Sequence, residues 1–335
     1  MIPVVEPPPS PPSASKSLFL RVGFILIILG AIFWVWSSQP FSPARVIRFQ
    51  VRKGVPARGV AKDLYDQGLL RHPISFLIWV KLLGHASGIK PGVYELSTRE
   101  SGFAIFRTFR KGPPLMRVTF PEGWTAKQMA ALLDARGVTT AADFLAIVGK
   151  EKREGFLFPD TYFFEQGLPA DQVVGRLTQR FKDKEPKDFK DRAKTMKLSE
   201  GQLVTLASIV EREARAPQER PIIAGVFLNR LHKHWYLESC ATVEYSLGGW
   251  KPHLSYKDLK VESPYNTYRH GGLPPGPICN PGAAALDAAA HPAQTDMMFF
   301  VADGQGTHRF SRYYNEHLAA QGVRGAKGEG GNQSK

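Results

Sequence analysis

A single long apolar run near the amino terminus places the strongest limit on how this chain can fold. The run covers Val22–Trp36 without a charge, and Leu18–Leu20 lengthens it upstream with only Arg21 between them. A bilayer core needs roughly 20 such residues, and an arginine near one end can reach the lipid headgroups. We therefore expect one transmembrane helix over residues 17–38, preceded by a disordered, proline-rich tail over residues 1–16.

A cleaved signal peptide is the alternative interpretation of this run. The run is long for the apolar part of a signal peptide, and residues 37–41 lack a small-x-small cleavage pattern. Basic residues flank the run on both sides, so the charge pattern leaves its orientation open. No second run of this length follows residue 38, and the remainder is expected to fold in water.

The composition excludes several classes of protein. The chain has 335 residues, of which 43% are hydrophobic and 22% are charged. These values are typical of globular domains and exclude wholesale disorder and a multi-span transporter. The net charge of +14 favours an anionic partner, such as nucleic acid, a membrane surface or a carboxylate-bearing polymer. Nucleic acid is not expected, because the basic residues form no strip interleaved with aromatic ones.

A strand followed by a helix is expected twice, at an offset of 69 residues. Val46–Val51 and Met116–Phe120 alternate as short strands do, and each precedes a glycine turn and an amphipathic stretch ended by glycine. A further strand at Gly92–Leu96 and a helix at Ala104–Arg110 are expected between the two copies. Two copies are too few for a solenoid, so the pattern favours a pair of small strand–helix units.

The composition changes near residue 150, and we place a domain boundary there. Residues 45–150 hold the two strand–helix units, and residues 151–319 are expected to form a second domain of mixed helices and strands. Residues 320–335, rich in glycine and polar groups, are expected to form a flexible tail. The expected fold class is therefore α+β, with a transmembrane helix at the amino terminus.

A helix expected over residues 199–216 carries the most specific chemical signal. An apolar stripe runs from Leu203 to Val210 with the spacing of one helix face, and the next position on that stripe is Glu213. Glu211 points about 200° away from Glu213 around the helix. A carboxyl on an apolar wall has a raised pKa and can stay protonated to act as a general acid. The alternative is a charged helix end at which both glutamates pair with arginines in solvent.

A loop rich in glycine, proline and asparagine follows at residues 263–282. The amide, hydroxyl and tyrosine side chains at residues 264–268 are of the kinds that bind sugars, although such side chains also satisfy a loop's own backbone. His232 and His234 are not part of a His-Glu-x-x-His pattern, and no metal site or cofactor is expected.

Seven ordered motifs resemble those of the endolytic murein transglycosylases of the MltG (YceG-like) type. The resemblance runs over about residues 45–315 and includes the single amino-terminal anchor. The motifs are Glu154–Tyr162, Leu206–Glu213, Val226–Leu231, Tyr265–Tyr268, Gly272–Gly276, Ala290–Ala293 and Phe300–Gly304.

The resemblance implies a single-pass inner-membrane protein with its catalytic domain in the periplasm and residues 1–16 in the cytoplasm. It implies a small LysM-like region within residues 45–150. The implied reaction cleaves the β-1,4 bond between N-acetylmuramic acid and N-acetylglucosamine inside a peptidoglycan strand and leaves a 1,6-anhydro end, without a cofactor. The implied partners are glycan strands, the inner membrane and peptidoglycan synthases, and the implied role is to end the elongation of nascent strands.

The family's catalytic glutamate falls on Glu213, the residue that the apolar stripe also selects. The resemblance implies that Glu213 first protonates the glycosidic oxygen and then takes the proton from the muramic C6 hydroxyl. We expect Asn266, Thr267, Tyr265 and Asn229 to bind the sugar, on residue type and motif position.

Two cysteines depart from the family's pattern, which often has Asp at the position of Cys240 and a small residue at that of Cys279. In the oxidising periplasm that the resemblance implies, we expect a Cys240–Cys279 disulfide that braces the loop.

A catalytically inactive, membrane-anchored wall-binding or scaffold protein is the alternative function. Glu213 separates the two hypotheses, because a scaffold has no use for a carboxyl group on an apolar helix face.

Overall fold

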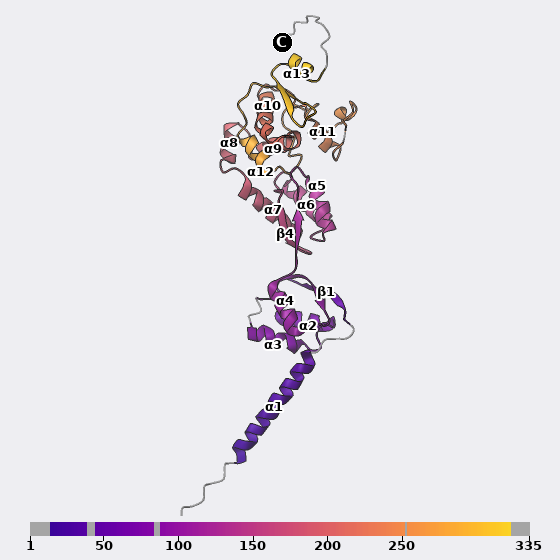
Figure 1. Cartoon of the computed structure of the whole chain (residues 1–335), viewed down its shortest axis with the longest axis vertical. Helices are drawn as coiled ribbons and strands as arrows, with labels where there is room; N and C mark the ends of the chain where they lie inside the picture. The colour runs from indigo at the N-terminus through magenta and orange to yellow at the C-terminus, as the bar shows by residue number, and fades with distance from the viewer. Residues whose placement is uncertain (1–13, 39–43, 84–87, 252, 323–335) are drawn as a thin grey trace, which may run out of the picture. The chain divides into compact units, whose positions relative to one another are not determined.

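The computed structural model describes residues 14–38, 44–83, 88–251 and 253–322 (Figure 1). Most of the two tails expected at residues 1–16 and 320–335 lies outside these described residues. The chain divides into two compact units, Met1–Leu115 and Met116–Lys335. Small two-stranded sheets combine with helices in both units, so the fold is of the mixed α+β class.

The first unit contains one antiparallel strand pair and the helices that pack on it. Its elements are α1 (Ala14–Ser38), β1 (Val46–Val51), α2 (Ala57–Asp66), α3 (Pro73–Leu83), β2 (Gly92–Ser97) and α4 (Gly102–Lys111). β1 and β2 pair from Val46 opposite Ser97 to Val51 opposite Gly92. Phe49 and Val51 are buried while the residues between and before them are more exposed, which is the alternation that predicted this strand.

Aromatic side chains form the core of this unit. Phe49 of β1 stacks on Phe109 of α4, with ring centroids 5.9 Å apart. Phe76 of α3 meets both Phe106 and Phe109 edge-on, at 6.2 and 5.9 Å. These rings are all 1% exposed or less, so the helices are held by packing rather than by their own propensity.

Helix α1 includes the residues of the expected transmembrane span, 17–38. Within the part of the chain that the structure describes, none of the helices has both the length and the hydropathy that a bilayer crossing requires.

The second unit holds the remaining elements. They are β3 (Leu115–Thr119), α5 (Ala126–Ala135), α6 (Ala141–Glu151), β4 (Thr161–Glu165), α7 (Ala170–Lys184), α8 (Phe189–Thr195), α9 (Glu200–Glu213), α10 (Arg220–His232), α11 (Cys240–Ser246), α12 (Ala283–Ala290), β5 (Phe299–Ala302), β6 (His308–Ser311) and α13 (Tyr314–Ala320), with short 3-10 helices at Pro217–Glu219 and Asp258–Lys260. β3 pairs with β4, and β5 pairs antiparallel with β6.

The boundary expected near residue 150 is wrong, because the compact units divide at residues 115 and 116. The two predicted strand–helix copies do form, but β1 and β3 belong to different units. The reason is a shared core: Met129 of α5 and Phe144 of α6 are fully buried in one cluster with Phe164 and Leu177, which follow residue 150. A change in amino-acid composition along the sequence does not reveal packing between elements on its two sides.

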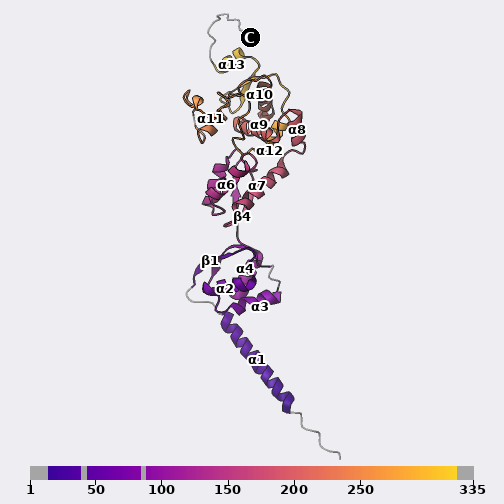
Figure 2. The ribbon, with the colours of Figure 1, turned by 180° about the vertical axis from the view of Figure 1, so that it is seen from behind.

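Helix α9 is the central helix of the second unit and packs against α8, α10, α11 and α12. Figures 1 and 2 both show it among α8, α10 and α12. Its start is fixed by Ser199, whose hydroxyl accepts a hydrogen bond from the Gln202 backbone N–H in a capping box. All residues from 203 to 210 are buried. The helix ends at Glu213 rather than at residue 216, because Ala214 is extended (φ −72°, ψ 120°).

Candidate active site

Glu213, the last residue of α9, lines a cavity of about 640 Å³. The other walls come from α11, from the loop around Tyr268, from the strand pair β5–β6 and from α13. Arg230 and His308 are among the polar residues that line the cavity. The cavity is of the size that holds a ligand of a few sugar rings, and Glu213 is its candidate acid.

The carboxyl group of Glu213 accepts two hydrogen bonds through the same oxygen. The Ser239 hydroxyl donates to Oε1 at 2.5 Å, and the Ala241 backbone N–H donates to Oε1 at 3.4 Å. Removal of the carboxyl from water raises the pKa of Glu213, while these two hydrogen bonds and the charge of His308 act in the opposite direction. The net pKa is raised, as a general acid requires.

Glu211 differs from Glu213 as the helix geometry predicts. Its Oε1 lies 3.2 Å from an Arg220 guanidinium nitrogen, and its Oε2 accepts a hydrogen bond from the Gly282 backbone N–H at 3.0 Å. The charged-end alternative therefore describes Glu211, although this ion pair is largely buried. It does not describe Glu213, because no arginine forms an ion pair with it among the described residues.

Ser239 is itself held by a buried network of hydroxyl groups. Its backbone N–H donates to Thr267 Oγ1 at 3.0 Å, and its carbonyl accepts from Thr242 Oγ1 at 2.7 Å. Thr242 Oγ1 and Thr267 Oγ1 lie 2.9 Å apart. Thr267 is 1% exposed and lines neither cavity, and its role in sugar binding stays a prediction. In the structure it contacts Ser239, the residue that holds Glu213.

A buried contact between a histidine and a glutamate lies at the same cavity. His308 lines the cavity, and its Nδ1 lies 2.7 Å from Glu219 Oε2. Glu219 Oε1 also accepts a hydrogen bond from the His308 backbone N–H at 2.8 Å. Both side chains are less than a tenth exposed, so this double contact fixes the imidazole ring at the cavity.

The other carboxylates that line this cavity are ion-paired. Glu238 Oε2 lies 3.1 Å from Arg230, and Glu244 Oε2 lies 3.4 Å from Arg212. Among the described residues, Glu213 is therefore the cavity carboxyl that is held by a hydroxyl and a backbone N–H instead of a cation.

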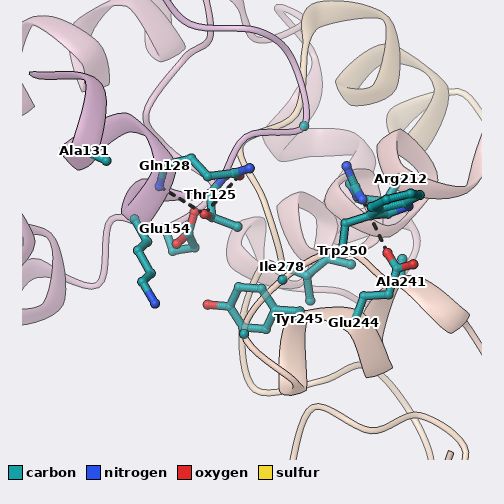
Figure 3. A pocket seen from close by; sticks show the side chains of 14 residues that line it. Thr125, Gln128, Ala131, Glu154, Arg212, Ala241, Glu244, Tyr245, Trp250 and Ile278 are labelled. Carbon is teal, nitrogen blue, oxygen red and sulfur yellow. Dashed lines mark hydrogen bonds and ion pairs between the residues drawn. The ribbon is translucent and has the colours of Figure 1, made fainter. Parts of the chain in front are cut away.

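A second cavity of about 570 Å³ adjoins the first (Figure 3). The two share four lining residues, Arg212, Ala241, Glu244 and Trp250. Figure 3 shows Thr125, Gln128, Ala131 and Glu154 on one side of this cavity, facing Arg212, Glu244 and Trp250 on the other, with Tyr245 and Ile278 between them. These shared residues place the second cavity directly beside the one that Glu213 lines.

Glu154 and Asn280 tie the walls of the second cavity together. Asn280 is fully buried, and its Nδ2 donates to Glu154 Oε1 at 2.9 Å and to the Trp124 carbonyl at 3.0 Å. Its Oδ1 accepts from the backbone N–H groups of Gly155 and Leu157, at 2.9 and 3.0 Å. Burial raises the pKa of Glu154 to about 7, although the hydrogen bonds to its carboxyl lower it.

Three further predicted sugar-binding residues do not line either cavity. Asn266 is fully buried, and its Nδ2 donates to the carbonyls of Leu259 and Val261, both at 2.9 Å. Asn229 Nδ2 donates in the same way to the carbonyls of Thr295 and Met297. The amide donors of Asn266 and Asn229 thus serve the backbone, and their role in sugar binding stays a prediction.

Tyr265 packs within the protein as well. Its ring lies 4.9 Å from the ring of Tyr245, and it contacts the core cluster around α9. It supports Tyr245, which lines the second cavity, and is not itself a wall of that cavity. The motif at residues 265–268 contributes Tyr268 to the Glu213 cavity instead.

The expected Cys240–Cys279 disulfide is absent, and both thiols are free. Cys240 is exposed, and its Sγ lies 3.3 Å from the Tyr268 hydroxyl in the Glu213 cavity. Cys279 is fully buried, and its Sγ donates to the Ser208 carbonyl on α9 at 3.3 Å. The two sulfurs thus face different partners, one at the cavity and one in the core.

Sequence reasoning missed Ser239, His308 and Glu219. Ser239 lies 26 residues from Glu213 in the chain, and His308 lies 89 residues from Glu219. Each is a single polar residue beside a loop, with no periodicity to mark it. His308 and Phe310 alternate with the exposed Arg309 in β6, which is the one signal that could have suggested an inward direction. Over the described ranges, no group of three or more His, Cys, Asp or Glu side chains is placed to hold a metal ion.

Known proteins resemble this chain over most of its length. Residues 49–322 match the model of the YceG-like family. The chain is 30% identical over 302 residues to the endolytic murein transglycosylase of Bacillus subtilis, which covers 82% of this chain and 84% of that protein. It is 27% identical over 296 residues to the protein of the same name from Streptococcus pneumoniae D39, and it spans about half of that longer relative (53%). A solved structure of a YceG-like protein from Listeria monocytogenes matches with a TM-score of 0.56 and 30% identity, over 82% of this chain and 99% of that one.

Proposed function

Because this chain belongs to the YceG-like family, we propose that it is an endolytic lytic transglycosylase of peptidoglycan. Two curated relatives of this chain carry the name endolytic murein transglycosylase. The observation that carries the proposal is the position of Glu213, a carboxyl with a raised pKa at the wall of a cavity that shares four lining residues with a second one.

The proposed reaction needs one carboxyl group and no water. Glu213 gives its proton to the oxygen of the bond between N-acetylmuramic acid and N-acetylglucosamine, and the bond from the muramic C1 to that oxygen breaks. The muramic C6 hydroxyl then attacks C1, and the Glu213 carboxylate takes the hydroxyl proton. The products are a free N-acetylglucosamine hydroxyl and a 1,6-anhydro end, and Glu213 is protonated again.

The pairing of the other carboxylates supports this scheme over ordinary hydrolysis. A retaining or inverting glycosidase uses a second carboxylate as nucleophile or base. Glu238 and Glu244 are both ion-paired with arginines at the cavity. Ser239 and Ala241 donate to Glu213 Oε1 and would stabilise the carboxylate that forms after the first proton transfer.

Anchoring in the inner membrane, with the catalytic unit in the periplasm, belongs to the same proposal. Its support is the uncharged sequence Val22–Trp36, in which large apolar side chains such as Leu26 (63% exposed) and Ile27 (70% exposed) face outward from α1. The proposal also includes a LysM-like region within residues 45–150 that holds glycan, contacts with peptidoglycan synthases and a role in ending strand elongation. Membrane fractionation tests the anchor: the full chain is expected in the membrane fraction, and a variant carrying Leu26→Arg and Ile27→Arg is expected to leave it.

The experiment for the activity incubates the full-length chain with purified sacculi in isotopically labelled water. Released fragments are then analysed by mass spectrometry. Internal fragments that carry unlabelled 1,6-anhydro ends are expected. Labelled reducing ends would mean hydrolysis and would contradict the proposed chemistry. Binding to sacculi without any release would instead favour the inactive wall-binding protein.

A further inference from the structure

The cavity beside the catalytic one has a wall suited to a sugar ring. Tyr245 and Trp250 line it, together with Ile278. The Trp250 side chain is 68% exposed, which leaves its ring open to a ligand. Flat aromatic faces bind the C–H face of a pyranose.

The position of this cavity fits a strand that extends beyond the bond to be cleaved. Arg212, Ala241, Glu244 and Trp250 line both cavities, so the second cavity lies beside the one at which the bond would be cleaved. The volume of about 570 Å³ is comparable to that of the Glu213 cavity, at about 640 Å³. One further disaccharide, or one muramic unit with the start of its substituent, is the scale of ligand that fits.

The charged side chains at this cavity indicate which ligands it can bind. Its two carboxyl groups are already satisfied, because Glu244 pairs with Arg212 and Glu154 accepts hydrogen bonds from Ala126 and Asn280. Lys127 of α5 also lines the cavity, and the structure gives it no ion pair among the described residues. The ammonium group of Lys127 is thus the charge at this cavity that remains available to a ligand.

We propose that this second cavity binds the muramic unit adjacent to the cleaved disaccharide, with Lys127 Nζ pairing with a carboxylate that the unit carries. This inference rests on the proposed function, since it takes the ligand to be a peptidoglycan strand. The carboxylate has two sources. A muramic unit without a peptide presents its lactyl carboxylate, whereas a unit with a stem peptide presents the carboxylates of that peptide.

Binding of defined strands to the full-length chain carrying Glu213→Gln tests the proposal without cleavage. Three ligands of matched length are compared: a strand with stem peptides, a strand freed of peptides by an amidase, and a chitin oligosaccharide, which has no carboxylate. Lys127→Glu is expected to weaken binding of a carboxylate-bearing strand about 10-fold, and Lys127→Ala roughly 3-fold, while chitin binding stays unchanged. The strand that loses affinity identifies the source of the carboxylate.

Two control variants, Lys150→Glu and Ala142→Trp, change exposed residues that line neither cavity. Lys150→Glu on α6 makes the same change in charge as Lys127→Glu, and no affinity should change. Ala131→Trp on α5 fills the cavity and should weaken binding of all three ligands, whereas Ala142→Trp on α6 should not. Thermal unfolding of each variant checks that it remains folded.

The inference is overturned if Lys127→Glu matches Lys150→Glu on every ligand, if it weakens chitin binding equally, or if Ala131→Trp has no effect. A failure of the proposed function is separate from these results. It would show as an absence of anhydro ends when the unsubstituted chain acts on sacculi.

Discussion

The hydroxyl of Ser239 lies 2.5 Å from Glu213 Oε1 and joins the end of α9 to the start of α11. Burial favours the protonated form of Glu213, and this hydrogen bond favours the carboxylate. A residue that must first give up a proton and then take one back requires both influences. Ser239 and the buried Thr267 behind it therefore position the acid and set how readily it ionises.

Replacing Ser239 with alanine should shift the pH dependence of cleavage. The lost hydrogen bond no longer stabilises the carboxylate, so the pKa of Glu213 rises and the alkaline limb of kcat/KM moves to higher pH. The maximal rate should fall roughly 10-fold, as expected for the loss of a hydrogen bond to a charged group. Ser246→Ala in the same helix, whose hydroxyl contacts the Thr242 carbonyl, is the matched control. An unchanged alkaline limb in Ser239→Ala would rule out this role.

His308 should also affect the alkaline limb of the pH dependence of kcat/KM. It lowers the pKa of Glu213 through its charge, and Glu219 holds it in place at 2.7 Å. His308→Gln removes that influence, so the alkaline limb moves to higher pH. Glu219→Gln weakens the contacts that hold the imidazole ring and should move the alkaline limb in the same direction by a smaller amount. A limb that moves to lower pH in either variant, measured on soluble glycan strands, would contradict the assignment.

Glu154 should make the stability of the chain depend on pH. Its pKa is about 7 in the folded chain and 4.5 in the reference state, so the folded protein binds the extra proton between these values. The free energy of unfolding should therefore fall as pH rises through this window, by at most about 3 kcal/mol. Glu154→Gln should lose this slope in urea unfolding at pH 5 and pH 8, while Glu151→Gln on the surface should keep it. Equal slopes in both variants would show that Glu154 is not the source.

The two cysteines should react as free thiols of different accessibility. In the native chain a thiol reagent should modify Cys240, and slowly, because burial raises the pKa of its thiol. Cys279 should react after denaturation without any reductant. Cys240→Ser serves as the control and should abolish the native reaction. If the denatured chain reacts with the thiol reagent only after reduction, the two cysteines form a disulfide and the prediction of free thiols is wrong.

Local patterns predicted the elements better than they predicted the contacts between them. The alternation of Val46–Val51 predicted strand β1, and the serine at residue 199 marks the start of helix α9. Both signals depend only on residues that are close in the sequence, and both elements are present. Glu213 could be selected as the candidate acid because the apolar stripe that leads to it lies on a single helix. The domain boundary failed because the core that joins Phe144 to Phe164 is a contact between separate elements.

Residue type alone did not show which side chains near Glu213 line the cavity and which satisfy the protein's own backbone. The amide of Asn266 and the hydroxyl of Thr267 suit a sugar and a loop backbone equally well, and the structure assigns both to the protein interior. Ser239 and His308 reach the cavity only through tertiary packing. The sequence therefore pointed to Glu213 as the candidate acid but not to the groups that contact it.

The most direct test of the central claim compares Glu213→Gln with Glu200→Gln, which makes the same change at the other end of α9. Both full-length variants are incubated with purified sacculi, and 1,6-anhydro ends are counted by mass spectrometry. Because a general acid contributes about 100- to 10,000-fold to a rate, Glu213→Gln should release at least 100-fold fewer anhydro ends, and Glu200→Gln should match the unsubstituted chain. A Glu213→Gln variant that folds normally and still releases anhydro ends at the original rate would contradict the account.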